Sequence, residues 1–173
     1  MIMNYVGLAK AAIEEYVRNG KIISIPENLP PEFHKKGRGV FVSLHKRKEL
    51  RGCVGTYLPA HENLAEEIIL NAVAACSRDY RFNSITADEL PILSVEVSLL
   101  SPPERIKNVG ELDPNKYGVV VKCSDGRTGL LLPDLEGVDS AQEQIAIACQ
   151  KAGINPVSDK EIEIHKFTVE KYE

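Results

Sequence analysis

The residues with the clearest chemical potential lie in one short stretch, 49–56, which contains Arg51, Gly52, Cys53 and Gly55. Its valine and threonine favour an extended strand, in which side chains two positions apart share one face. Arg51 and Cys53 are therefore expected to point the same way, and a guanidinium beside a thiol favours the nucleophilic thiolate. Glycine within a strand is typical of a bulge or of close approach by a ligand or another backbone. The stretch thus predicts either a reactive thiol or a cysteine that only fills space in the core.

Three ionisable side chains elsewhere in the chain are candidates for the same site. Asp79 and Arg81 flank Tyr80 directly after a predicted buried helix, so they either pair and lock a loop or point into a pocket. Glu96 alternates with apolar residues in a predicted strand, where every second side chain faces the same way. If that face meets the Cys53 strand, Glu96 is an acid–base candidate.

The composition restricts the class of protein. The chain has 173 residues, a net charge of −4 and no tryptophan, which disfavours a nucleic-acid surface, because such surfaces are normally basic and often aromatic. No apolar run approaches the roughly 20 residues that span a bilayer, and no secretory signal is visible. Four cysteines occur without a Cys-x-x-Cys pair, and the four histidines share no metal-ligand spacing. We therefore expect a cytoplasmic protein with reduced thiols. The sequence assigns no metal ligands and leaves open both the involvement of a metal and the identity of any cofactor.

The periodicity of apolar residues predicts the elements that must position the candidate residues. Helices are predicted over 4–19, 63–77 and 140–152, the last opened by a capping box at Ser140, and a short helix over Thr86–Glu89 is closed by Pro91. Residues 40–44 and 49–57 are expected to form an antiparallel hairpin across a charged turn. Further strands are predicted over 93–101, 117–123, 128–132 and 161–170. Cys76 and Cys149 fall on apolar helices and are expected in the core.

Several separated stretches together resemble one family, the AMMECR family, whose prokaryotic members are called protein A of the AmmeMemoRadiSam system. The resemblance covers nearly the whole chain and departs from the family pattern at Tyr80, at Asn83 and in the lack of a C-terminal tryptophan. The stretches that carry it are Gly39–Leu44, Leu50–Thr56, Asp79–Phe82, Val95–Pro103, Gly129–Pro133 and Lys151–Gly153.

The resemblance implies an α+β fold in which an antiparallel sheet packs with helices, in two lobes with a cleft between them. It implies a single AMMECR-like domain over residues 1–173 and a suspected active site at Arg51, Gly52, Cys53 and Gly55. It also implies two partners, a Memo-like protein related in fold to extradiol-type dioxygenases and a radical-SAM protein. It names no substrate.

Two functions follow from these residues. In an enzyme, Cys53 is a nucleophile in a cysteine-bearing cleft, Arg51 stabilises its thiolate or holds an anion, and Glu96 or Asp79 moves a proton. In a binding module, the same strand holds a small anionic molecule or the tail of a partner, with arginines as forks. The candidate set is catalytic Cys53 and Glu96, with binding residues Arg51, Gly52, Gly55, Thr56, Asp79 and Arg81.

Overall fold

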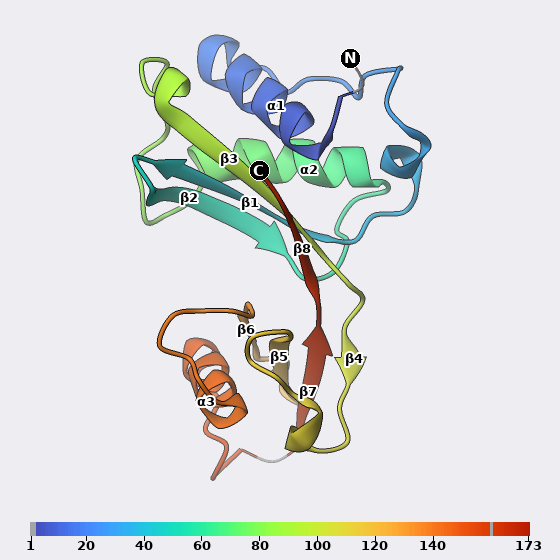
Figure 1. Ribbon diagram of the computed structural model, residues 1–173, viewed down its shortest axis with the longest axis vertical. Helices are drawn as coiled ribbons and strands as arrows, with labels where there is room; N and C mark the ends of the chain where they lie inside the picture. Colours follow the sequence, from blue (N-terminus) through green and yellow to red (C-terminus); the bar gives the residue numbers. More distant parts are fainter. Residues whose placement is uncertain (1–2, 160) are drawn as a thin grey trace. The chain divides into compact units, whose positions relative to one another are not determined.

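The computed structural model describes residues 3–159 and 161–173, and within them it shows the α+β fold that was predicted (Figure 1). The strands form two antiparallel four-stranded sheets, in the orders β2-β1-β3-β8 and β4-β7-β5-β6. The chain divides into two compact units. One extends to Leu99 and includes Glu170–Glu173, and the other comprises Leu100–Val169.

The bounds of the elements agree with most of the sequence-based expectations. The helices are α1 (Tyr5–Asn19), α2 (Leu64–Ser77) and α3 (Ala141–Ala152), with short 3-10 helices η1 (Pro31–His34), η2 (Leu90–Ile92) and η3 (Val109–Glu111). The strands are β1 (Gly39–Lys46), β2 (Glu49–Thr56), β3 (Leu93–Leu100), β4 (Glu104–Arg105), β5 (Gly118–Cys123), β6 (Thr128–Leu131), β7 (Ile162–Phe167) and β8 (Val169–Tyr172).

Two predicted elements differ from the structure. The helix expected over Thr86–Glu89 is a turn that leads into η2. The capping contact does form, with Glu89 Oε2 accepting from the Thr86 N–H at 3.1 Å, but Pro91 has no N–H with which to extend an α-helix. The single strand expected over 161–170 is interrupted at Thr168, and β7 and β8 on either side of it belong to different sheets. Ser101 bonds both backbone groups of Thr168, which accounts for this break in the strand.

In the first unit, α1 and α2 cover one face of the β2-β1-β3-β8 sheet (Figure 1). Alternate residues of β1 and β3 are buried in the core on that face, namely Val40, Val42, Leu44, Val95, Val97 and Leu99. Because side chains alternate along a strand, Ser43 and Glu96 lie on the opposite face of the sheet. Cys53 is paired with Ser43 in the β1–β2 ladder, which places it on that same face.

The turn between β1 and β2 consists of Arg47 and Lys48, whose φ angles of 54° and 71° are both left-handed. Two-residue hairpins favour this twist, but asparagine and glycine usually occupy it, because a Cβ atom crowds the backbone there. Both side chains are exposed and carry positive charge. The hairpin therefore holds two cations at its tip at some cost in backbone strain.

Replacing this pair by Arg47→Asn with Lys48→Gly is expected to raise the free energy of unfolding by about 1 kcal/mol, because the turn strain is relieved. Urea unfolding monitored by circular dichroism measures the change. The matched control is Arg47→Gln with Lys48→Gln, which removes the same charges and retains the strain. A midpoint for the Asn-Gly variant no higher than that of this control would contradict the prediction.

In the second unit, α3 packs against strands β5 and β6 of the other sheet. The predicted capping box is present: Ser140 Oγ accepts from the Glu143 N–H, and the Glu143 carboxylate accepts from Ser140. Gly153 ends the helix with a left-handed φ of 66°. Cys149 lies in this core, as Cys76 lies in that of the first unit, so both expectations are confirmed. No helix in the described ranges is both long enough and apolar enough to cross a bilayer.

Candidate functional site

The candidate site is built on a β-bulge in strand β2. Residues Val40–Leu44 of β1 pair regularly with Gly52–Thr56, and the ladder then resumes with His45 opposite Leu50. Arg51 is thus the extra residue, without a register partner in β1. A bulge of this kind bends the strand and redirects a side chain, and bulges are common beside functional sites. The bulge explains why Arg51 and Cys53 do not follow the simple alternation that the sequence suggests.

Both glycines of the stretch are required by the close approach of protein backbone. A Cβ atom on Gly52 would overlap the carbonyl oxygen of Ala75 in α2, and one on Gly55 would overlap the carbonyl oxygen of Val40 in β1. Neither glycine has a left-handed φ. The space that was expected to be open for a ligand at these two positions is therefore occupied by neighbouring elements.

The backbone of Cys53 is held from both sides while its side chain stays partly exposed. Its N–H donates to Asp79 Oδ2 at 2.9 Å, and its carbonyl oxygen accepts from Arg81 Nη2 at 3.3 Å. Its Sγ accepts from the hydroxyl of Ser43 at 3.2 Å. The other three cysteines are buried, so Cys53 is the most accessible cysteine of the chain.

Asp79 and Arg81 form the bidentate ion pair that supplies these contacts. Arg81 Nε lies 3.0 Å from Oδ1 and Nη2 lies 2.8 Å from Oδ2, while the Arg81 N–H also donates to Oδ1 at 3.1 Å. The Asp79 side chain is only 4% exposed. Hydrogen bonds from Arg81, followed by that from the Cys53 N–H, hold the pKa of Asp79 far below its usual range. Of the two interpretations kept open for Asp79, the loop-locking pair is therefore the one that forms.

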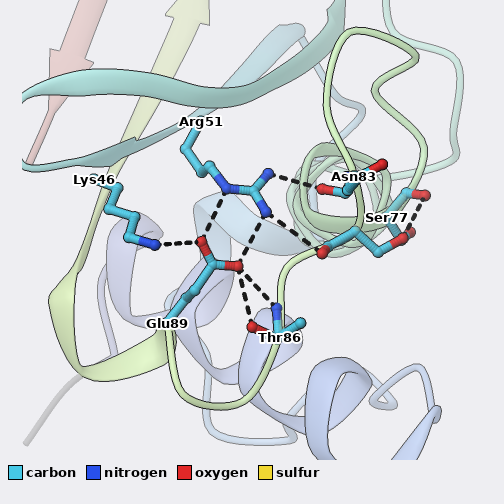
Figure 2. A network of polar contacts seen from close by, with 7 residues as sticks. Lys46, Arg51, Ser77, Asn83, Thr86 and Glu89 are labelled. Atoms are coloured by element: carbon cyan, nitrogen blue, oxygen red, sulfur yellow. Dashed lines mark hydrogen bonds and ion pairs between the residues drawn. The ribbon is translucent and has the colours of Figure 1, made fainter.

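The guanidinium of Arg51 is held by a different carboxylate, that of Glu89 (Figure 2). Its Nε and Nη2 lie 3.0 Å from Oε1 and 3.0 Å from Oε2. Nη1 donates to the carbonyl of Asn83 at 2.8 Å, and Nη2 also donates to that of Ser84 at 3.4 Å. The Arg51 side chain is only 18% exposed. All three of its nitrogens are thus committed to the loop that precedes η2.

Glu89 is the centre of this second network (Figure 2). Lys46 Nζ lies 2.9 Å from Oε1, and both the N–H and the hydroxyl of Thr86 donate to Oε2. The carboxylate is 8% exposed. Hydrogen bonds from Arg51, then from Lys46 and Thr86, lower the pKa of Glu89 to about 2 despite its burial. In the sequence, Glu89 was noticed only for its capping-box spacing from Thr86. That spacing gave no indication that Glu89 would pair with a residue of β2.

The structure therefore groups the predicted residues differently from the sequence. Arg81 rather than Arg51 lies beside Cys53, and the pKa of Arg81 is raised mainly by Asp79, with a smaller contribution from the Cys53 thiol. The sequence analysis did not identify Ser43 as a site residue. Pairing the two strands residue by residue from the hairpin turn would have placed it near Cys53, its partner in the ladder.

Two predicted residues lie outside this group of contacts. Glu96 shares the sheet face of Ser43, and its Oε1 accepts from Ser98 Oγ at 3.3 Å. Thr56 is exposed at the end of β2 and donates to the Leu58 carbonyl at 2.6 Å. Across residues 3–159 and 161–173, no three or more histidine, cysteine, aspartate or glutamate side chains are placed to hold a metal ion.

The fold and the site define a class: two-unit α+β proteins in which a bulged Arg-Gly-Cys-Val-Gly strand is held by buried carboxylates. The chain belongs to the AMMECR1 family, whose family model matches residues 6–172.

Relatives and a solved structure agree with this assignment. A protein of Thermotoga maritima is 53% identical over 97% of this chain and 96% of its own length. A protein of Clostridium acetobutylicum is 45% identical over 97% of this chain, which spans only 35% of that longer protein. The crystal structure of an uncharacterized protein from Pyrococcus horikoshii superimposes with a TM-score of 0.87 at 36% identity, covering 96% of this chain and 88% of the other.

Proposed function

We propose that this protein acts on a small molecule through the thiol of Cys53. One observation carries the proposal: the Asp79–Arg81 pair holds Cys53 by both its N–H and its carbonyl, yet the residue stays partly exposed. A cysteine that only fills space is usually buried, as Cys76 is. Groups that must meet a substrate in one geometry are typically fixed in this way by surrounding hydrogen bonds.

Two polar groups lie near the thiol. The Ser43 hydroxyl donates to the sulfur, and the Arg81 guanidinium is near enough to interact with its charge. The thiolate is the nucleophilic form of a cysteine, and both groups can interact with it. In the simplest step, the thiolate sulfur adds to a carbonyl carbon of the substrate and the π electrons move to the carbonyl oxygen. That oxygen then takes the proton that the thiol lost, for which Glu96 on the same sheet face is the acid–base candidate.

The proposal places the protein in a cytoplasmic pathway with a Memo-like protein and a radical-SAM protein, the partners that the family resemblance implies. The Clostridium acetobutylicum relative contains the matched region within a chain of which it is about a third. That arrangement supports a function exerted beside other domains or proteins.

Alkylation of the native protein with iodoacetamide tests the proposal. Peptide mass spectrometry is expected to show modification of Cys53 at least about tenfold faster than that of Cys76 or Cys149, because burial raises the pKa of Cys76 to about 11 and also raises that of Cys149. Ser43→Ala should slow the reaction of Cys53. Equal rates at Cys53 and Cys76 would overturn the nucleophile and favour the non-catalytic binding module.

A further inference from the structure

The two arginines of the site differ in how many of their donors the protein uses. Arg51 engages Nε, Nη1 and Nη2 with Glu89 and two backbone carbonyls. Arg81 engages Nε and Nη2 with Asp79 and the Cys53 carbonyl, and its Nη1 has no partner within the described ranges. The Arg81 side chain is 43% exposed, against 18% for Arg51. Arg81 therefore has both N–H donors of Nη1 to offer to a molecule from solution, whereas the less exposed Arg51 has one N–H of its Nη1 without a partner in the described ranges.

The negative charge that balances Arg81 faces the protein interior. Asp79 is 4% exposed, and its two oxygens accept from the Cys53 N–H, the Arg81 N–H and the Nε–Nη2 edge of the guanidinium. Nη1 makes none of these contacts, and the Arg81 side chain is partly exposed. Phe82 supports the guanidinium from one face, with 5.4 Å between Cζ and the ring centroid. The guanidinium is thus fixed in position as well as charged.

We propose that Nη1 of Arg81 binds the anionic group, a carboxylate or a phosphate, of the small molecule on which Cys53 acts. The inference rests on the proposed function. Nη1 carries two N–H donors, and a planar guanidinium suits carboxylate and phosphate oxygens. Because Nη2 of the same guanidinium is 3.3 Å from the Cys53 carbonyl, the bound anion lies beside Cys53. The substrate is therefore a small anion with an electrophilic carbon near its charged group, bound by Arg81 and not by Arg51.

Two reagents of nearly equal size test this assignment. In both iodoacetamide and iodoacetate, the thiolate sulfur attacks the carbon that bears iodine, and iodide leaves. Only iodoacetate is an anion. The ratio of the iodoacetate rate to the iodoacetamide rate at Cys53 is expected to fall about fivefold in Arg81→Gln at 0.15 M salt, an effect in the range of one partly exposed charge pair. Arg78→Gln, the same change at a nearby exposed arginine, should leave the ratio close to that of the wild type.

The outcomes separate the two proposals. Slow iodoacetamide modification of wild-type Cys53 overturns the proposed function and this inference with it. If iodoacetamide modifies Cys53 fast but the ratio of the iodoacetate rate to the iodoacetamide rate is the same in wild type and Arg81→Gln, only the inference about Arg81 is overturned. Should Arg81→Gln fail to fold, the wild-type ratio decides the matter: it should fall as salt rises towards 1 M, where charges are screened within about 3 Å. A ratio independent of salt would contradict anion binding.

Discussion

Gly52→Ala is expected to lower the free energy of unfolding by about 3 kcal/mol, at the upper end of typical overpacking effects. The added methyl group would overlap the carbonyl oxygen of Ala75, an atom of the α2 backbone. A backbone oxygen inside a helix cannot rotate aside, so either α2 or β2 must shift and the core between them must repack. The smaller conformational entropy of unfolded alanine offsets only about 0.4–1 kcal/mol of this loss.

Urea unfolding of the variant measures this change. The control is Gly7→Ala in α1, where the nearest atom to the new Cβ would be Asn4 Oδ1 at 3.2 Å. Its effect should stay within about 1 kcal/mol, the helix propensity difference between glycine and alanine. Unfolding of Gly52→Ala at the wild-type midpoint would show that the glycine does not serve the packing of α2 on β2.

Glu89→Gln is expected to cost about 3 kcal/mol at pH 7, because it leaves the poorly exposed Arg51 without its carboxylate. The pH dependence is equally specific. The folded pKa of about 2 lies below the ordinary glutamate pKa of 4.5, so ionised Glu89 stabilises the folded state above pH 4.5. This contribution is lost as the pH falls from 4.5 towards 2. The difference between wild type and variant should therefore shrink from about 3 kcal/mol at pH 7 to about 1 kcal/mol at pH 3.

Urea titrations of both proteins between pH 7 and pH 3 measure this convergence. Because both chains retain every other titrating carboxyl group, including Asp79, taking the difference isolates Glu89. Asp88→Asn removes the same charge from the adjacent, exposed residue and should change stability by no more than about 0.5 kcal/mol at any pH. A difference between wild type and Glu89→Gln that stays constant with pH would contradict the role assigned to this carboxylate.

The sequence by itself determined the elements and the family. Apolar periodicity located the three helices and the main strands, because helices and half-buried strands repeat over 3.6 and 2 residues. Local chemistry also predicted the capping box at Ser140 and a hairpin across the charged turn His45–Glu49, which the structure narrows to residues 47–48. The family motifs predicted the α+β fold. Only the structure showed the assignment of β7 and β8 to different sheets, since which neighbours a strand pairs with is not a local property.

The grouping of the site residues was decided by tertiary structure alone. The sequence placed Arg51 beside Cys53 because alternate residues of a regular strand share a face. The bulge breaks that alternation, and Arg51 instead meets Glu89, which lies 38 positions along the chain. Arg81, 28 positions from Cys53, instead bonds the backbone carbonyl of Cys53. Residue types and spacing identified the reactive stretch, but ion pairs between separate elements depend on how the chain packs, which no local pattern encodes.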